Sequence, residues 1–408
     1  MIWSIAWKNI WRNKLRSMVV IIAIFLGMTG GIFSAAVMNG AAEQRVKDAI
    51  DYETSHIRIS LPQFQEDLGQ EFYITHSPEL VSALSQMPWC KSACSRLKIN
   101  AMANTAHASG PVQIIGVNPE EDQTVFAINK AICDTCGSWF EGTSKFPLVA
   151  GDKFCNKLKV RLKSKVVFSF QDQSGEITGS APKVDGIFHI SNNLFNEYRV
   201  FVPVSELATV TQLPMDAAHE IYVRLKSGKD LQMAKDLIQK ALPGMLVQTW
   251  EEIDPSLGMI SGLMDAMMMV FMSIILLALG FGIVNTMLMV VLERTRELGM
   301  LKAIGMTRRR IFNMIMLETL LLTVTGAVVG IGFSVFLVSY TGSTGIDLGN
   351  LSEGLEAAGY ASFIYPSLNP MFFVELAVLV IITGISAALF PARRATRLNA
   401  AEAVRIEG

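Results

Sequence analysis

Charged side chains are scarce in this sequence. Only 17% of its 408 residues are Asp, Glu, Lys or Arg, whereas 51% are hydrophobic. The mean hydropathy is accordingly positive, at +0.37. Soluble domains ordinarily carry about 25% charged residues. The scarcity therefore argues against an ordinary soluble protein and predicts a membrane protein.

Catalytic motifs are missing as well. The five histidines are scattered along the chain, and no nucleophile elbow, metallopeptidase motif or paired acid stands out. The chain also lacks the G-x-x-x-x-G-K-[ST] loop that binds nucleotide phosphates. We therefore predict that the chain is not an enzyme by itself and holds no cofactor of its own.

Cysteine is rare, and all five cysteines lie between residues 90 and 155. Their restriction to one segment outside the apolar runs indicates an oxidising compartment. The local disulfide candidates are Cys90 with Cys94 and Cys133 with Cys136, but fifteen arrangements leave one cysteine free. A zinc site and a thioredoxin-like redox role are alternatives that the compartment and the missing βαβ context disfavour. We predict no metal site.

Long apolar runs are present and divide the chain. Four of them can cross the ~30 Å of hydrocarbon that about 20 helical residues span. The expected spans are 17–42, 258–292, 311–340 and 371–390. The first is read as a retained signal anchor, and residues 1–16, with Trp3, Trp7 and Trp11 on one face, as an interfacial helix.

The loops differ in basic residues. Lys and Arg gather in 1–16, 293–310 and the tail 391–408, whereas the loop 341–370 contains neither. Cytoplasmic loops carry the excess of Lys and Arg. Both termini are therefore expected in the cytoplasm, and segment 43–257 and loop 341–370 outside.

Segment 43–257 contains no further spanning run and is expected to be an α+β domain, built of one or two subdomains. The period-two stretches "SHIRISL", "VQIIGV", "KVVFSF", "YRVFVPV" and "HEIYVRL" predict strands. The stretches "PELVSALSQM" and "GKDLQMAKDLIQKALPG" predict helices. The flanks "EQRVKDAIDYE" and "WEEIDPSLGMISGLMD" are expected to continue the first two spans outward as helical stalks.

The charged block 293–310 combines charge with an apolar ridge. Leu298, Leu301 and Ile304 recur at i, i+3 and i+6, which predicts a helix from about 295 to 304. Gly305 is expected to end this helix, and Thr307 to cap the next one. The ridge is expected to enter a groove on a cytoplasmic partner. Glu318, two turns into the third span, is expected to pair with an arginine of the block.

The stretch "ERTRELGMLKAIGMTRRRIFNMIMLETLLL" resembles the coupling helix and third span of FtsX/MacB-type ABC transporter permeases. The ending "FPARRATRLNAAEAVR" and the start "WKNIWRNKLRS" are similar to the same family. Four spans with one large outer domain, and no fused ATPase, resemble the lipoprotein-releasing LolC/LolE-type permeases most. The resemblance implies a four-helix membrane protein with a MacB-like periplasmic core domain.

The resemblance further implies a multi-pass permease of the bacterial inner membrane that works with a second permease chain and with a separate ATPase dimer holding ATP and Mg. Lipoprotein is the implied substrate, with a periplasmic carrier, and no nucleic acid is involved. MacB-like efflux and FtsX-like signalling to a cell-wall hydrolase are the alternatives. The residues implied in ATPase coupling are Glu293, Arg296, Glu297, Leu298, Gly299, Leu301, Lys302, Ala303, Ile304 and Gly305.

Two further features of the spans suggest contacts within the membrane. The second span is rich in methionine, whose flexible side chain suits promiscuous apolar surfaces. The substrate-cavity candidates are Met264, Met267, Met268, Phe271 and Met272, although a lipid-facing helix explains them too. Gly326 and Gly330 form a small-residue motif through which membrane helices associate. We expect an oligomer, because four helices cannot enclose a path for a large substrate.

Overall fold

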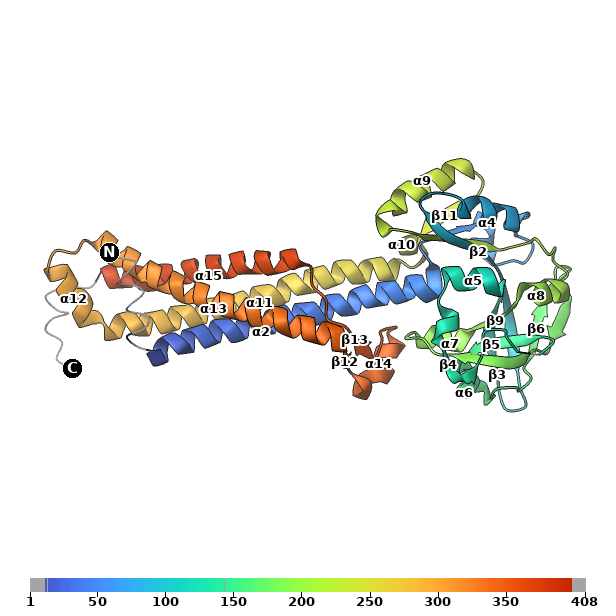
Figure 1. Ribbon diagram of the computed structural model, residues 1–408, viewed down its shortest axis with the longest axis horizontal. Coiled ribbons are helices and arrows are strands. Elements are labelled where there is room, and N and C mark those ends of the chain that lie inside the picture. The colour runs from blue at the N-terminus through green and yellow to red at the C-terminus, as the bar shows by residue number, and fades with distance from the viewer. Residues whose placement is uncertain (1–11, 13, 143, 398–408) are drawn as a thin grey trace. The chain divides into compact units, whose positions relative to one another are not determined.

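The computed structural model describes residues 12, 14–142 and 144–397 (Figure 1). They form two compact units. The first takes in the chain up to Ala42, Gly262–Ile346 and the chain from Ile364 onward, and the second comprises Glu43–Ser261 and Asp347–Phe363. The predicted interfacial helix over 1–16 falls almost entirely outside the described residues, as does most of the tail 391–408.

The first unit is helical. Its long helices are α2 (Lys14–Asp48), α11 (Pro255–Glu293), α13 (Arg308–Thr344) and α15 (Pro370–Thr396). Within the described residues, four helices are long and apolar enough to cross a membrane, as expected. Each extends past the uncharged run that predicted it, because flanking charged residues such as Glu43 and Lys47 still favour a helical backbone.

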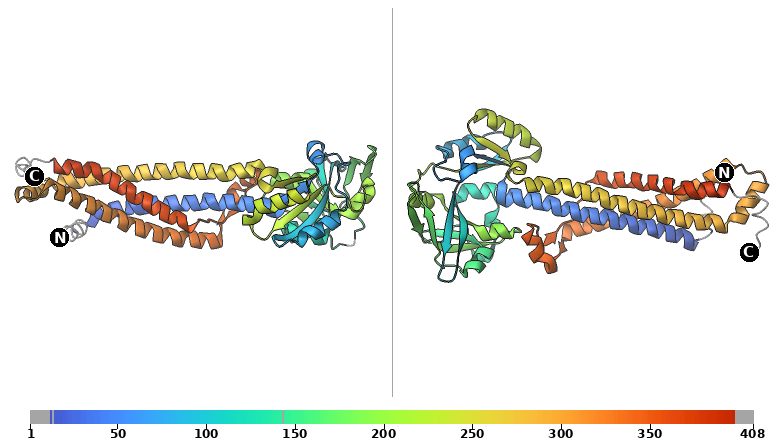
Figure 2. Two further views of the ribbon diagram at one scale, coloured as in Figure 1. Left: turned by 90° about the horizontal axis from the view of Figure 1, so that it is seen from above. Right: turned by 180° about the vertical axis from the view of Figure 1, so that it is seen from behind.

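The long helices of this unit run side by side (Figure 2), and close packing between them occurs at glycines of α13 and α15. A Cβ added at Gly326 would lie 2.9 Å from Cβ of Ile24 on α2, and one at Gly330 would lie 3.1 Å from Cβ of Met28. A Cβ at Gly384 of α15 would meet Oγ1 of Thr323 at 2.6 Å. The Gly326–Gly330 motif is thus used inside the chain, which corrects its expected role between chains.

The second unit is built on an 11-stranded sheet of the order β11-β1-β10-β2-β3-β9-β5-β8-β4, with β6 paired to β2 and β7 to β6. The strands are β1 (Ile57–Ser60), β2 (Cys90–Asn104), β3 (Ser109–Val117), β4 (Ile132–Gly137), β5 (Pro147–Gly151), β6 (Val167–Gln171), β7 (Ile177–Ser180), β8 (Lys183–Phe188), β9 (Arg199–Pro203), β10 (Glu220–Leu225) and β11 (Leu246–Thr249). All five predicted strands are present, but β2, the longest, was not predicted.

Short helices accompany the sheet. They are α3 (Pro62–Asp67), α4 (Ser77–Ser85), α5 (Pro119–Val125), α6 (Asp152–Leu158), α7 (Asn193–Tyr198), α8 (Val204–Thr211), α9 (Leu231–Ala241) and α10 (Trp250–Ile253). The two predicted helices correspond to α4 and α9. Of the stalks, the first is helical, since α2 runs to Asp48 and a π-helix follows at Ala49–Thr54. The second is interrupted at Asp254, between α10 and α11.

The loop 341–370 contributes residues 347–363 to the second unit. It contains β12 (Ile346–Asp347), a 3-10 turn at Gly349–Leu351, α14 (Ser352–Ala357) and β13 (Phe363–Ile364). Glu356 of α14 lies 3.7 Å from Nε2 of His189 and 4.0 Å from Nζ of Lys153. These contacts join segments that lie more than 150 residues apart in the sequence.

The cysteines pair once in the described part of the chain. Cys133 and Cys136 form a disulfide, whereas Cys90, Cys94 and Cys155 are free and buried. The predicted pairing of Cys90 with Cys94 is wrong, because both lie on β2. Four residues of strand separate their Cα atoms by about 13 Å, and a disulfide needs less than about 7 Å.

Candidate coupling site

The charged block folds as a short helix, α12 (Thr295–Ala303), directly after α11. Arg294 forms the turn between them, and its carbonyl accepts a hydrogen bond from Leu298 N at 2.9 Å. Gly305 ends the segment at a φ of 98°, where glycine carries no steric penalty. Met306 N then donates to the Leu301 carbonyl at 3.0 Å. The predicted stop at Gly305 is confirmed, whereas Thr307 occupies the cap position of α13 without a side-chain bond.

Arg294 fastens α12 to the helix bundle. Its Nε donates to Glu297 at 2.9 Å, and its Nη1 donates to the Glu318 carboxylate at 3.2 and 3.3 Å. Glu318 is only 6% exposed on α13. The expected pairing of Glu318 with an arginine of the block is therefore confirmed. Sequence reasoning missed only which arginine it is, the one that immediately follows the last residue of α11.

Glu297 also interacts with a second arginine. Arg12 forms an ion pair with it, so that residues 285 apart in sequence meet at the start of α12. Burial opposes the ionisation of Glu297, but the hydrogen bonds from Arg294 and Arg12 outweigh burial and lower its pKa. The carboxylate of Glu297 therefore stays ionised. Its ion pairs link α12 to Arg294, which follows α11, and to Arg12, which precedes α2.

The apolar ridge of α12 does not face outward as a whole, which corrects the expectation of a free ridge. Leu298 is 4% exposed and belongs to the core of the bundle, and Leu301 is half-buried against the same core. Gly299 is buried too, and only Ile304, at 86% exposed, is open. The ridge turns inward because Arg294 anchors this side of α12 to Glu318.

A different face of α12 is open. Arg296, Met300 and Ala303 are exposed and follow each other at i, i+4 and i+7, which places them on one side of the helix. Glu293 and Gly305 at its two ends are exposed too, whereas Glu297 and Lys302 are half-buried. Met300 is 45% exposed and is an apolar side chain among charged ones. We call Arg296, Met300 and Ala303 the open face of α12.

The substrate-cavity candidates are not gathered in a cavity. Met267 and Phe271 are 41% and 49% exposed, Met264 and Met268 are half-buried, and Met272 is buried. They spread around α11 because its apolar residues cover the whole circumference. A cavity of about 320 Å³ lies further along α11, between it and α2. Its lining residues are Val20, Ala23, Ile24, Gly27, Ile275, Ala278, Leu279, Gly282, Ile283 and Thr286.

A second cavity, of about 250 Å³, lies between α11 and α15. It is lined by Leu276, Leu277, Gly280, Phe281, Val284, Thr383, Ser386 and Ala387. None of the five substrate-cavity candidates lines either of these two cavities. The small residues Gly282, Ala278 and Ala23 leave room for the first cavity. These small residues within two apolar spans are the sequence signal that could have located it.

Comparison with known proteins decides the family. The model of the MacB-like periplasmic core domain matches residues 17–241, and the model of the FtsX-like permease C-terminal region matches residues 269–400. The chain belongs to the FtsX/MacB-type ABC transporter permeases. The two family models together match parts of both units of this permease, as the resemblance of the coupling stretch implied.

The permease is also similar to several known proteins. It is 26% identical to the uncharacterized ABC transporter permease YknZ of Bacillus subtilis, over 98% of both chains. It is 23% identical to the probable export ATP-binding/permease protein MacB of Pseudomonas entomophila, where the match covers 98% of this chain but only 58% of that protein. The extracellular domain of YknZ matches 48% of this chain at a TM-score of 0.34 and 14% identity, and 99% of that domain is covered.

Proposed function

We propose that this chain is the permease subunit of an ABC exporter of a bacterial inner membrane, with cytoplasmic termini. A separate ATPase dimer, which binds ATP and Mg, docks on the open face of α12. The observation that carries this proposal is the combination of an exposed apolar and charged face with a helix fixed to the bundle by Arg294. A fixed helix can transmit force, because its displacement must move the elements to which it is bound.

The packing of the bundle provides a route for such force. Arg294 links α12 to Glu318 of α13, and α13 packs against α2 with no space for a side chain at Gly326. α13 also meets α15 at Gly384. Tightly packed helices shift as units rather than deform. A push on α12 is therefore expected to move α13 with α2 and α15, and α2 leads directly into the outer unit.

Site-directed cross-linking tests the docking surface. A photoreactive side chain at Met300 should cross-link the ATPase in membranes, since the position is exposed. The matched control is position 298, two residues away, whose side chain is 4% exposed. Equal cross-linking from both positions, or none from position 300 in an assembled complex, would show that the ATPase docks elsewhere.

Release of lipoproteins from the inner membrane is the substrate function that we propose, and a second permease chain completes the assembly. The apolar cavity of about 320 Å³ between α2 and α11 supports it, because acyl chains require an apolar site within the bilayer. MacB-like efflux is the second candidate. It is favoured by relatives such as the pyoverdine export protein PvdT of Pseudomonas putida, 24% identical over 98% of this chain and 59% of that protein.

Reconstitution separates these functions. Proteoliposomes that contain the permease chain with its ATPase and an acylated lipoprotein should release the lipoprotein to a soluble carrier only with ATP. ATP hydrolysis without release, together with drug sensitivity of cells that lack the chain, would favour efflux. Activation of a cell-wall hydrolase without any transport would favour the FtsX-like signalling role.

A further inference from the structure

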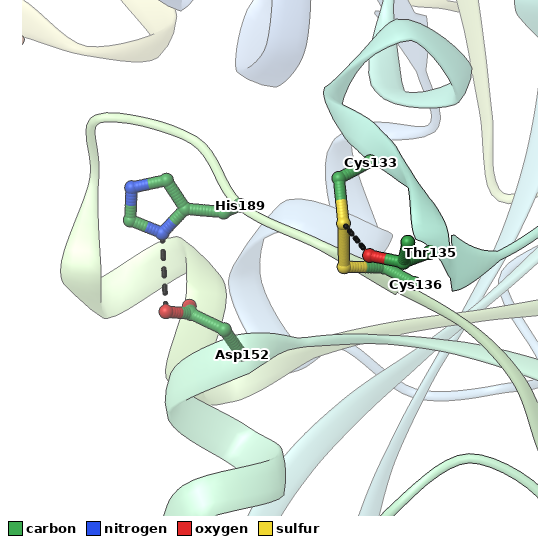
Figure 3. Close-up of a disulfide and its surroundings, with 5 residues drawn as sticks. All are labelled: Cys133, Thr135, Cys136, Asp152 and His189. Carbon is green, nitrogen blue, oxygen red and sulfur yellow. Dashed lines mark hydrogen bonds and ion pairs between the residues drawn. A yellow bond between two sulfur atoms is a disulfide. The ribbon is translucent and has the colours of Figure 1, made fainter.

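The disulfide between Cys133 and Cys136 stands apart from the sheet to which its strand belongs. β4 pairs with β8 at Ile132–Phe188 and at Gly137–Gly186. The two paired positions are thus five residues apart on β4 but only two residues apart on β8. Residues 133–136 therefore form a bulge outside the ladder. The two sulfur atoms close this bulge on itself (Figure 3). The disulfide therefore connects no second element to β4.

The ends of the bulge are held without the disulfide. On one side, His189 N donates to the Ala131 carbonyl at 3.0 Å, and on the other Ser138 N donates to the Asp185 carbonyl at 3.2 Å. Gly137 has a φ of 97°, and a Cβ there would lie 2.1 Å from the Asp185 carbonyl oxygen. Closing so short a loop also removes little entropy from the unfolded chain. Backbone hydrogen bonds thus hold both ends of the bulge independently of this bond.

The bond is accessible to a thiol. Cys133 is exposed and Cys136 half-buried, whereas Cys90, Cys94 and Cys155 are 2%, 0% and 4% exposed. Thr135 Oγ1 lies 3.4 Å from Cys133 Sγ, and its hydroxyl can donate a hydrogen bond to that sulfur. Burial also raises the pKa of Cys155 to about 12, so this thiol cannot compete as a nucleophile.

We propose that Cys133–Cys136 is a site of reversible thiol–disulfide exchange on the native protein. The partner is a dithiol, which is either a small molecule or the C-x-x-C pair of an oxidoreductase. A thiolate of the dithiol attacks Cys133 Sγ, the bond between the two cysteine sulfurs breaks, and Cys136 leaves as a thiolate that takes up a proton. The second thiolate of the dithiol then attacks the dithiol sulfur that is bonded to Cys133, and Cys133 leaves as a thiolate that also takes up a proton. The chain gains two electrons, and the dithiol becomes a disulfide.

The experiment uses the full chain in nanodiscs. The protein is treated with dithiothreitol under native conditions and alkylated, and each cysteine is quantified by mass spectrometry. Cys133 and Cys136 should be fully alkylated while Cys90, Cys94 and Cys155 stay unmodified until denaturant is added. Oxidised dithiothreitol should then restore the bond in protein that was not alkylated. A thioredoxin-fold dithiol protein in place of dithiothreitol distinguishes the two sources of the dithiol.

Two results would overturn the proposal. One is a disulfide that resists dithiothreitol until the protein unfolds. The other is simultaneous alkylation of all five cysteines, which would show that reduction requires or causes unfolding. The variant with both Cys133→Ser and Cys136→Ser provides the control. It should show the circular dichroism spectrum and the exchange protection of β8 that the oxidised protein shows, and loss of either would contradict the proposal.

Discussion

At the scale of single residues, the ion pairs of Arg294 fix the position of α12. Its guanidinium forms ion pairs with Glu297 of α12 and with Glu318 of α13 at the same time. Glu318 is 6% exposed, so its carboxylate has little access to water. Removing one partner of such a buried pair leaves the other charge without compensation, and this loss exceeds the net contribution of the intact pair.

Replacing Arg294 by Met should therefore destabilise the helical unit by about 3 kcal/mol. The loss should be smaller in the double variant Arg294→Met with Glu318→Met, in which no unpaired carboxylate remains. Thermal unfolding of the four proteins of this double-mutant cycle in detergent measures the coupling. Additive losses at the two positions would contradict a direct pair.

Residue-scale expectations from sequence succeeded where the local pattern decides the outcome. Gly305 ends α12 because a left-handed residue is needed there, and glycine is the residue that adopts that conformation freely. The burial of Leu298 could not be predicted, because a spacing of three residues defines a ridge but does not say which partner it meets. Leu298 faces the bundle core because the ion pair between Arg294 and Glu318, which are 24 residues apart, fixes that side of α12 to α13.

At the scale of elements, the contact of α13 with α2 depends on glycines that leave little room for a side chain. Gly330→Leu should lower stability by about 1–3 kcal/mol, because its side chain must displace Met28 and Phe25. Gly332→Leu on the same helix is the matched control, since a Cβ there meets nothing within 4 Å. Equal melting temperatures for the two variants would contradict this packing.

The contact of α14 with His189, within the second unit, is expected to depend on pH. His189 lies between Asp152 of α6, 3.1 Å from its Nδ1, and Glu356 of α14, with Lys153 as the nearby cation. The hydrogen bond to Asp152, aided by the charge of Glu356 and opposed by burial and Lys153, raises the pKa of His189 above 6.5. A raised pKa means that the stabilisation is complete below pH 6.5 and is lost as pH rises through the folded value.

Hydrogen exchange of residues 352–358 measures this dependence. Exchange, corrected for its intrinsic pH dependence, should accelerate as pH rises through the folded pKa. The change should be about fivefold at most, because half-exposed ion pairs contribute about 1 kcal/mol or less. His189→Asn should flatten the profile. A dependence that survives this substitution would assign the effect to another group.

Elements with a strong internal period were predictable, and elements defined by distant partners were not. Apolar runs gave the four spans, and period-two stretches gave strands such as β9 and β10. β2 escaped because its sequence "CKSACSRLKINAMAN" mixes charge into buried positions. Its Arg96 is 1% exposed and is tolerated only because Asp122 of α5 lies 2.7 Å away. Residues 347–363 likewise join the second unit through distant partners, such as His189 with Glu356.

At the scale of the whole molecule, the features described above support one account of how the permease works. In the function proposed above, the open face of α12 would receive the ATPase, Arg294 would pass the displacement to α13, and the glycine contacts would pass it to α2 and α15. The buried side of α12 packs on the bundle, while the open side is the surface proposed to bind the partner. Substitutions on the two sides should therefore differ in kind, since Leu298 supports folding and Met300 supports coupling.

The most direct measurement of this account is substrate-stimulated ATP hydrolysis by the assembled complex with Met300→Glu. The carboxylate would be buried without a partner at the interface, so stimulation and transport should fall at least tenfold, which corresponds to a loss of about 1.4 kcal/mol or more. The melting temperature of the permease should stay unchanged, and Met300→Leu should remain active. Full stimulation by a well-folded Met300→Glu complex would contradict the central claim that the ATPase acts on the open face of α12.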